Sequence, residues 1–319
     1  MLAHTLIGLI GLLAVQQTRF TGTRVGFPAR LPVAKYQRAE TYAPNLKVAD
    51  SVGVGVTAQA ALLMDAASGK VLFEKNADET LPIASMTKLV TAMTFLDAKP
   101  NMQEEVEVLP EDEDEETRSV IDDYEVLTKK ELLQALLIGS VNKAAHVLAR
   151  TTGGKEAFVL AMNEKVRTLS MRGATFVDPS GIHPENRANA HEVAMILRAA
   201  LAYPEIREMT GQPSLILIGR ASGKPYEIKN TNLLLTSYLH RDPYRILAGK
   251  TGSLPQAGYC LTLATRFERA HDVIAVVLNS ENHFSRFQDV KAMTTWAFAS
   301  YEWPKRSPLV VRDAVSSRP

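Results

Sequence analysis

The sequence predicts an α/β domain with a mostly helical insertion. Apolar runs with strand character stand early, in "AALLMD" and "VLFEKN", and again late, in "RILAGKTGS", "GYCLTLATRF" and "HDVIAVVLN". The chain between them carries apolar residues at helical spacing. We therefore expect one sheet that joins both ends of the domain, with the helices inserted between its strands. No period of about 20–50 residues recurs, so a repeat architecture is not expected.

The individual elements follow from local patterns. The first two apolar runs are joined by a Ser-Gly-Lys turn at 68–70 and predict a hairpin. Helices are expected within five stretches: 82–93, 129–151, 155–171, 191–203 and 284–303. The second stretch is interrupted by Gly139, Ser140 and Asn142, which predicts two helices that meet at a short polar turn. After Pro213 the pattern turns to strands, beginning with "SLILIG".

Composition excludes several classes of protein. A chain of 319 residues, 46% hydrophobic and 22% charged, is long enough to bury its own core, as one large domain or two small ones. A formal net charge of +1 provides no field that would attract nucleic acid. The single cysteine, Cys260, excludes an intramolecular disulfide and a cysteine-based zinc site, and its apolar neighbours predict that it is buried.

The N-terminal residues predict export. The apolar run at 5–15 is too short to span a membrane and matches the core of a signal peptide in length, although no early Lys or Arg and no small-residue cleavage site accompany it. Membrane contact is expected at most through this segment. The chain then divides into four parts: a signal-like segment at 1–18, a linker or disordered arm at 19–56, a catalytic domain at 57–303 and a tail at 304–319.

Two patterns suggest a metal site but lack its ligands. The acidic run "EDEDEE" at 111–116 has neither the glycine nor the ligand spacing of a calcium loop, so we expect a solvated and structurally neutral surface loop. "HEVAM" begins like the zinc motif H-E-x-x-H, but Met195 stands where the second histidine is required, which leaves His191 at the start of a helix. We expect no metal and no cofactor.

Ser85 and Lys88 have the spacing S-x-x-K in "PIASMTKLVTAM". An i, i+3 separation on a helix places the hydroxyl and the amine on the same face, so the lysine could act as a base for the serine. The amine must then be neutral near pH 7, which requires burial or a neighbouring cation, since lysine has an ordinary pKa of about 10.4. Taken alone the motif is weak, because a capping Ser and an exposed Lys explain it almost as well. Leu89, Val90 and Met93 would bury the helix and hold the pair on rigid structure.

Two further motifs follow along the chain. Ser140 and Asn142 form S-x-N where helical periodicity breaks; the hydroxyl could relay a proton to a leaving amine, and the amide could hold a substrate carbonyl. Lys250, Thr251 and Gly252 form K-T-G on an expected strand. There the lysine charge would attract a substrate carboxylate, and the glycine would let a substrate backbone approach as an added strand. Three weak motifs in this order and spacing together make a strong indication of one site.

With these motifs the sequence resembles the penicillin-recognising serine DD-peptidases, which include the low-molecular-mass penicillin-binding proteins and their relatives the class A β-lactamases. The resemblance covers about 59–303 and extends to "ALLMDAASGKVLFEKN", "FVDPSGIHPENRANAHEVA", "IKNTNLLL" and "KTGSLPQAGYCL". It implies a β-lactamase/DD-peptidase-like fold, with an antiparallel sheet flanked by helices. It also implies D-alanyl-D-alanine carboxypeptidase or endopeptidase activity on peptidoglycan stem peptides or cross-links in the periplasm or cell envelope, with β-lactam antibiotics as covalent inhibitors.

The resemblance assigns a catalytic role to the first two motifs and to the lysine of the third. Ser85 would be the acylated nucleophile and Lys88 its general base. Ser140 and Lys250 would shuttle protons, and Asn142 would orient the substrate.

The resemblance also makes the end of the third motif a substrate-binding strand. Thr251 would orient the substrate beside Gly252, and the N–H groups of Ser85 and Ser253 would form the oxyanion hole. Few residues follow this motif, with no room for the β-rich domain and membrane-binding helix of many carboxypeptidase relatives. That feature, with "GGKEAFVLAMNEKV" and "YPEIREMTGQ", favours an endopeptidase over a carboxypeptidase, although both reactions would use the same catalytic residues.

Other classes of protein fit less well. A class A β-lactamase would carry E-x-x-L-N near 176–190 and an Asp at Val141, and the sequence has neither. A Ser-His-Asp hydrolase would need a nucleophile elbow such as G-x-S-x-G, which is missing. A non-catalytic cell-wall or penicillin-binding module is the remaining alternative, and the intact Ser85, Lys88 and Lys250 argue against it.

Overall fold

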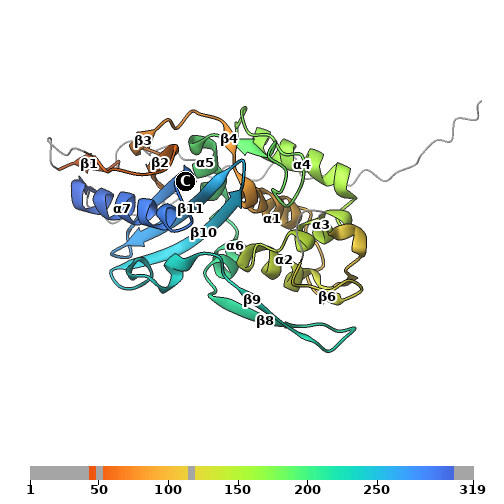
Figure 1. Ribbon diagram of the computed structural model, residues 1–319. Helices are drawn as coiled ribbons and strands as arrows, with labels where there is room; N and C mark the ends of the chain where they lie inside the picture. Colours follow the sequence, from red (N-terminus) through yellow and green to blue (C-terminus); the bar gives the residue numbers. More distant parts are fainter. Residues whose placement is uncertain (1–42, 48–52, 114–118, 305–319) are drawn as a thin grey trace, which may run out of the picture. The chain divides into compact units, whose positions relative to one another are not determined.

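The computed structural model describes residues 43–47, 53–113 and 119–304 of the chain. Its centre is an antiparallel sheet of five strands in the order β10-β11-β12-β2-β3 (Figure 1). These strands are β2 Ala60–Asp65, β3 Val71–Lys75, β10 Tyr244–Leu254, β11 Gly258–Phe267 and β12 His271–Ser280. Because β12 pairs with β2, the sheet joins both ends of the domain, and this prediction is confirmed.

Helices account for most of the chain between β3 and β10. They are α1 Thr87–Asp97, α2 Lys129–Ile138, α3 Asn142–Arg150, α4 Lys155–Thr168, α5 Ala190–Ala200 and α6 Pro204–Thr210, and a last helix, α7 Ser285–Ser300, follows the sheet. Each of the five predicted helical stretches is confirmed, and α2 and α3 meet at the predicted polar turn. The fold is the predicted antiparallel sheet flanked by helices.

The two faces of the sheet are buried under different helices. Along β2, Leu62 packs into the core that contains α1 and α5, whereas its neighbour Leu63 packs into the core that contains α7. The same alternation places Val276 and Val277 of β12 in opposite cores. Since both faces are covered, β2 is buried along its whole length, which explains why its sequence is almost uniformly apolar.

Four small two-stranded sheets surround this core. They are β1 Asn45–Leu46 with β13 Tyr301–Glu302, β4 Leu81–Pro82 with β7 Arg187–Ala188, β5 Glu105–Glu107 with β6 Val126–Thr128, and β8 Ser214–Ile218 with β9 Pro225–Lys229. The predicted strand "SLILIG" is β8, but it pairs with β9 and not with the central sheet. Strand β1 lies within the segment that the sequence predicted as a linker, while 1–18 lies outside the described residues, so the predicted domain boundaries stay predictions.

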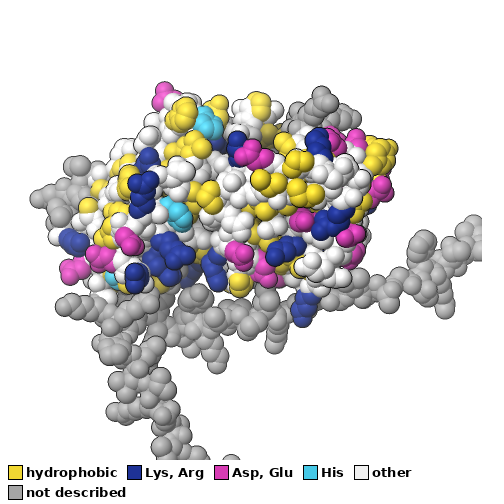
Figure 2. Space-filling model, turned by 90° about the horizontal axis from the view of Figure 1, so that it is seen from below, with side chains coloured by type: hydrophobic (Ala, Val, Ile, Leu, Met, Phe, Trp, Pro, Cys, Tyr) yellow, Lys and Arg dark blue, Asp and Glu magenta, His cyan; other side chains and the backbone are white. Residues whose placement is uncertain are grey.

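The surface of the described residues adds two observations. On the face seen in Figure 2, Lys and Arg side chains are interspersed with Asp and Glu, consistent with a net charge of +1. No helix in the described ranges is both long and apolar enough to cross a membrane.

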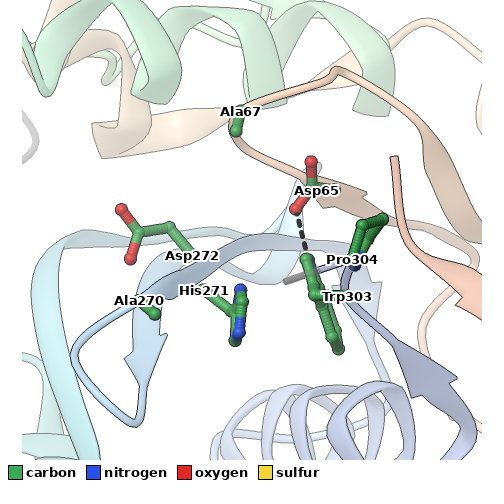
Figure 3. Close-up of a pocket in the computed structure, with 7 residues that line it drawn as sticks. All are labelled: Asp65, Ala67, Ala270, His271, Asp272, Trp303 and Pro304. Carbon is green, nitrogen blue, oxygen red and sulfur yellow. Dashed lines mark hydrogen bonds between the residues drawn. The ribbon is translucent and has the colours of Figure 1, made fainter. Parts of the chain in front are cut away.

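A small pocket of about 40 Å³ lies at the end of the sheet away from the K-T-G motif of β10 (Figure 3). Its wall includes Trp303, whose Nε1–H donates to Asp65 Oδ1 at 2.8 Å. Ligand pockets usually enclose about 300–1,000 Å³, so this pocket is too small to hold a peptide substrate.

Candidate active site

A short 3-10 helix, Ala84–Met86, carries Ser85 and leads directly into α1. Lys88, in the first turn of α1, places its Nζ 2.9 Å from Ser85 Oγ. The predicted pair is therefore within hydrogen-bonding distance, although the serine lies on the tighter 3-10 turn. Ala84 adopts φ +47°, a left-handed conformation that costs a non-glycine residue about 1–2 kcal/mol. Strained backbone of this kind is common where a turn must present a functional side chain in one orientation.

The Lys88 side chain has no exposed surface. Besides Ser85, its Nζ donates to Asn142 Oδ1 at 2.7 Å and to the main-chain carbonyl of Ser180. These acceptors come from three separate parts of the chain, so the position of the amine depends on the tertiary structure. Leu89 and Val90, which follow it, are fully buried as predicted.

Ser140 and Asn142 lie at the junction of α2 and α3. Ser140 adopts φ +59°, and its Oγ accepts a hydrogen bond of 2.8 Å from Lys250 Nζ. Asn142 begins α3 and faces Lys88. The S-x-N turn therefore contacts both lysines, and it joins the Ser85–Lys88 pair to the Ser140–Lys250 pair.

The K-T-G motif lies on β10, the edge strand of the central sheet. Lys250 is 1% exposed. This burial lowers the pKa of Lys250 well below its ordinary value, and the neighbouring charges of Lys88 and Arg286 lower it further. Lys250 therefore loses its proton far more readily than an exposed lysine.

The absence of a side chain at Gly252 is required by the packing of the protein's own backbone, apart from any approach of a substrate. A Cβ atom at this position would lie 2.8 Å from the Ile83 carbonyl oxygen and 3.2 Å from the Ser85 amide nitrogen. The glycine therefore lets β10 pack directly against the turn that carries Ser85. Ser253, the next residue, is exposed.

The loop at 178–183 completes the site, although none of its residues belongs to the three motifs. The Asp178 carboxylate accepts the N–H groups of Ser180 at 2.6 Å and Gly181 at 2.7 Å. Burial alone would raise the pKa of Asp178, but hydrogen bonds from the Ser180 hydroxyl and from the N–H groups of His183, Gly181 and Ser180 lower it below its ordinary value. Gly181, at φ +83°, approaches the Ala84 carbonyl so closely that a side chain there would overlap it. The Asp-Pro-Ser-Gly run is the sequence pattern that marks this loop, which presents the Ser180 carbonyl to Lys88.

Thr231 and Arg286 also contact β10, and neither belongs to one of the three motifs, although Thr231 lies in the run "IKNTNLLL". Thr251 Oγ1 donates to Thr231 Oγ1 at 2.6 Å, which orients the threonine of the K-T-G motif. Arg286, in the first turn of α7, is 4% exposed and donates through Nη1 to the Gly252 carbonyl at 3.0 Å. Among the described residues, neither Arg286 nor Lys250 forms an ion pair with a carboxylate.

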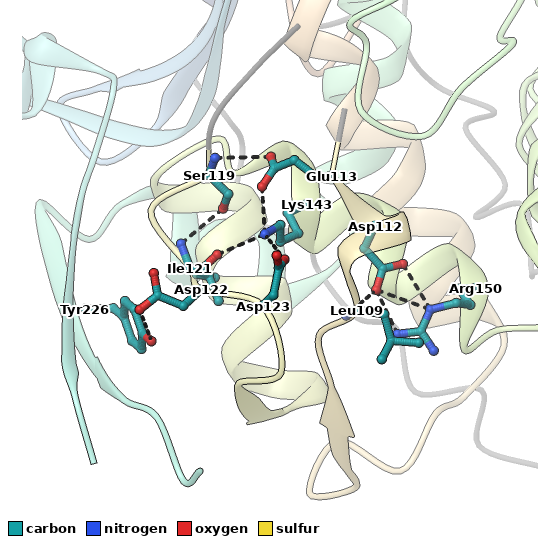
Figure 4. A network of polar contacts seen from close by, with 10 residues as sticks. All are labelled: Leu109, Asp112, Glu113, Ser119, Ile121, Asp122, Asp123, Lys143, Arg150 and Tyr226. Atoms are coloured by element: carbon teal, nitrogen blue, oxygen red, sulfur yellow. Dashed lines mark hydrogen bonds and ion pairs between the residues drawn. The ribbon is translucent and has the colours of Figure 1, made fainter. Parts of the chain in front are cut away.

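The acidic run at 111–116 was predicted to be a solvated and structurally neutral surface loop. This prediction is wrong for Asp112 and Glu113, which form ion pairs with cations of α3. Asp112 is fully buried and pairs with Arg150 through hydrogen bonds of 2.9 and 2.8 Å (Figure 4). Glu113 lies 2.6 Å from the buried Nζ of Lys143, which also pairs with Asp123 at 2.8 Å. Because Lys143 directly follows Asn142, these ion pairs anchor the segment to the helix that carries the S-x-N motif. Residues 114–118 lie outside the described ranges.

No group of three or more His, Cys, Asp or Glu side chains is placed to hold a metal ion in the described part of the chain. His191 lies in the first turn of α5, 3.5 Å from Glu74, as expected of a residue at a helix start. Cys260 is fully buried, which confirms that prediction.

Solved structures place this fold among the DD-peptidases and penicillin-binding proteins. A point variant of the Streptomyces K15 DD-transpeptidase superposes with a TM-score of 0.71 at 25% identity, covering 77% of this chain and 99% of that one. Penicillin-Binding Protein D2 from Listeria monocytogenes, in its cefotaxime-bound form, superposes with a TM-score of 0.65 at 26% identity over the same shares of the two chains. The predicted DD-peptidase fold is confirmed.

Sequence comparison identifies the family. The profile of peptidase family S11, described as D-alanyl-D-alanine carboxypeptidase, matches residues 47–282. The D-alanyl-D-alanine endopeptidase of Pseudomonas aeruginosa is 34% identical over 242 residues, which cover 74% of this chain and 76% of that protein. The chain belongs to the S11 family of serine-type D-alanyl-D-alanine peptidases, and it is a hydrolase.

Proposed function

We propose that Ser85 is the nucleophile of this peptidase and that Lys88 is its general base. The observation that carries the proposal is that each of two serines is paired with a buried lysine, at 2.9 Å for Ser85 and Lys88 and at 2.8 Å for Ser140 and Lys250. In its neutral form Lys88 takes the proton of Ser85 as the oxygen attacks the scissile carbonyl. Ser140 and Lys250 carry a proton to the leaving amine. Water then hydrolyses the acyl-enzyme and restores Ser85.

The substrate would bind along the open edge of β10 as an added strand. Thr251 and Asn142 would orient it, and the N–H groups of Ser85 and Ser253 would stabilise the oxyanion. The carboxylate that ends the D-alanyl-D-alanine unit would lie near Arg286. This guanidinium stays charged at neutral pH and is buried without a carboxylate partner among the described residues, so a substrate carboxylate would supply the missing charge.

We propose cross-linked stem peptides as the preferred substrate, so that the enzyme acts as an endopeptidase in the cell envelope. The Pseudomonas aeruginosa relative is named a D-alanyl-D-alanine endopeptidase, which supports this preference. Carboxypeptidase activity is the second candidate, because the family description names it and the same residues would perform it. The apolar run at 5–15, which would direct export, lies outside the described residues, so export stays a prediction.

Acylation of Ser85 by β-lactams follows from the same mechanism, since a β-lactam carbonyl would occupy the place of the scissile one. The Listeria monocytogenes structure with bound cefotaxime supports this proposal. Release of the penicilloyl group should be slow, because the sequence lacks the E-x-x-L-N motif of class A β-lactamases.

The substrate preference is tested with purified protein and two substrates at equal concentration, a pentapeptide stem and a cross-linked muropeptide dimer. We expect conversion of dimer to monomers to be faster than release of D-alanine from the pentapeptide, as measured by chromatography of the products. Release of D-alanine with the dimer left intact would make the enzyme a carboxypeptidase.

A further inference from the structure

Three ring side chains gather beside the end of the K-T-G motif. Tyr259 of β11 is the strand partner of Ser253 on β10. The ring of His283 lies 5.8 Å from that of Tyr259 and 5.1 Å from that of Phe284, in edge-to-face contacts. Phe284 is 65% exposed and lies at the open side of this group. We call Tyr259, His283 and Phe284 the aromatic platform.

The turn that carries Phe284 is held firmly. Asn282 Oδ1 accepts the N–H groups of Phe284 at 2.9 Å and Ser285 at 3.0 Å. The Phe284 carbonyl in turn accepts the N–H of Phe287 at 3.0 Å, in the first turn of α7. An aromatic ring on a fixed turn offers apolar area with little entropy left to lose on binding.

Arg286 connects the aromatic platform to the catalytic strand. Its guanidinium lies 5.6 Å from the Tyr259 ring, and Nη2 is 3.2 Å from His283 Nδ1. The same guanidinium donates to the Gly252 carbonyl at 3.0 Å. A substrate carboxylate at Arg286 would therefore be in reach of both the catalytic strand and the platform.

The chemistry of the reaction indicates which part of the substrate would lie beside Arg286 and the aromatic platform. The carboxylate closest to the scissile bond belongs to the residue whose amine leaves, so groups beyond Arg286 face the leaving side. When a pentapeptide is hydrolysed, the leaving group is D-alanine, which carries only a methyl group. When a cross-link is cleaved, the leaving amine belongs to a side chain of a second peptide stem, which is large enough to extend past Arg286.

We propose that the aromatic platform binds the second peptide stem of a cross-link, on the leaving side of the scissile bond. The stem would lay aliphatic side-chain carbons on the exposed face of Phe284 while its carboxylate pairs with Arg286. The inference rests on the proposed endopeptidase function and adds a determinant of substrate size. The platform therefore favours cleavage of cross-links over release of D-alanine.

The test compares Phe284→Ala, Phe284→Leu and wild-type protein in cross-link cleavage, in D-alanine release and in the rate of acylation by benzylpenicillin. Loss of one aromatic contact should lower the ratio of kcat/KM for cross-link cleavage to that for D-alanine release by roughly 3- to 10-fold in Phe284→Ala, and by less in Phe284→Leu. Leu160→Ala is the matched control, because Leu160 is 72% exposed on α4. It should leave the ratio as in wild type.

Each alternative result has a distinct meaning. If Phe284→Ala lowers all three rates equally, the platform supports the catalytic strand and does not select the substrate, which overturns the inference. An unchanged ratio in Phe284→Ala overturns it as well, while the proposed endopeptidase function stands. Wild-type protein that releases D-alanine but leaves dimers intact refutes the endopeptidase function itself.

Discussion

Two regions of this molecule bury positive charge in opposite ways. Beside α3, Lys143 contacts Glu113 and Asp123, and Arg150 forms a bidentate pair with the fully buried Asp112. Beside β10, Lys250 and Arg286 are buried as deeply as Lys143, whereas Arg150 keeps 27% of its side chain exposed. Among the described residues, Lys250 and Arg286 contact hydroxyl, carbonyl and imidazole groups but no carboxylate.

The difference indicates what each region is for. Burying a charge without an opposite charge is costly, so a protein retains such a group mainly where function uses it. The paired charges beside α3 hold an acidic segment against the helix that carries the S-x-N motif. In the proposed mechanism a substrate carboxylate would pair with Arg286, and the same burial lowers the pKa of Lys250, which suits it to proton transfer.

The largest effect should come from removing the Ser85 hydroxyl, the proposed nucleophile beside β10. Ser85→Ala should lower acylation by a fluorescent penicillin by about three orders of magnitude or more, because it removes the hydroxyl that lies 2.9 Å from Lys88 Nζ. The thermal unfolding midpoint should barely change, since Lys88 retains its contacts with Asn142 and Ser180. Labelling is read on a gel and unfolding by circular dichroism.

Ser214→Ala, at an exposed serine of β8, is the control for that experiment and should label normally. Undiminished labelling of Ser85→Ala would place the nucleophile elsewhere. Rapid release of the penicilloyl group by wild-type protein would instead indicate a β-lactamase.

A second, smaller effect tests the paired region. Asp112→Ala removes the buried carboxylate that accepts from Arg150 and from the Leu109 N–H, and should lower the free energy of unfolding by roughly 2 to 3 kcal/mol in denaturant titration. Glu227→Ala, which breaks an exposed pair with Lys229, should cost less than about 1 kcal/mol. Equal costs for the two variants would mean that burial does not distinguish these pairs.

The smallest effect is a pH dependence of the free energy of unfolding, caused by Glu125, which accepts hydrogen bonds from the hairpin β8–β9. Burial alone would raise the pKa of Glu125, but hydrogen bonds from Ser222, Val126, Tyr226 and Ala221 lower it to about 2, against an ordinary 4.5. Because the folded-state pKa is the lower one, the stabilisation is complete above pH 4.5 and is lost as the pH falls through about 2. It should amount to a free energy of unfolding on the order of 2 kcal/mol.

The measurement is the free energy of unfolding between about pH 5 and pH 2, in wild type and in Glu125→Gln. The variant should lose less stability with acid than wild type does. Glu164→Gln, at a mostly exposed position, should follow the wild-type curve. A variant curve parallel to wild type throughout would show that Glu125 does not titrate with folding.

Much of the fold could be predicted because its elements follow local rules. The alternation of apolar residues, the turn at 68–70 and the break at Gly139 each depend on neighbours in the chain. The pairing of β8 could not be predicted, since a short apolar strand carries no mark of which partner it will meet. The burial of Asp112 was missed for the same reason, because its partner Arg150 is distant in sequence.

By itself, the sequence determined the family, the three motifs and the residues that carry them, since their identity and order are local facts. Only the tertiary structure decided how these residues act together. It brings Ser180 to Lys88, Thr231 to Thr251 and Arg286 to Gly252, each across a long stretch of chain. It also decided which buried cations of the described residues contact a carboxylate and which do not, because burial and the distance between charges are set by packing and not by sequence spacing.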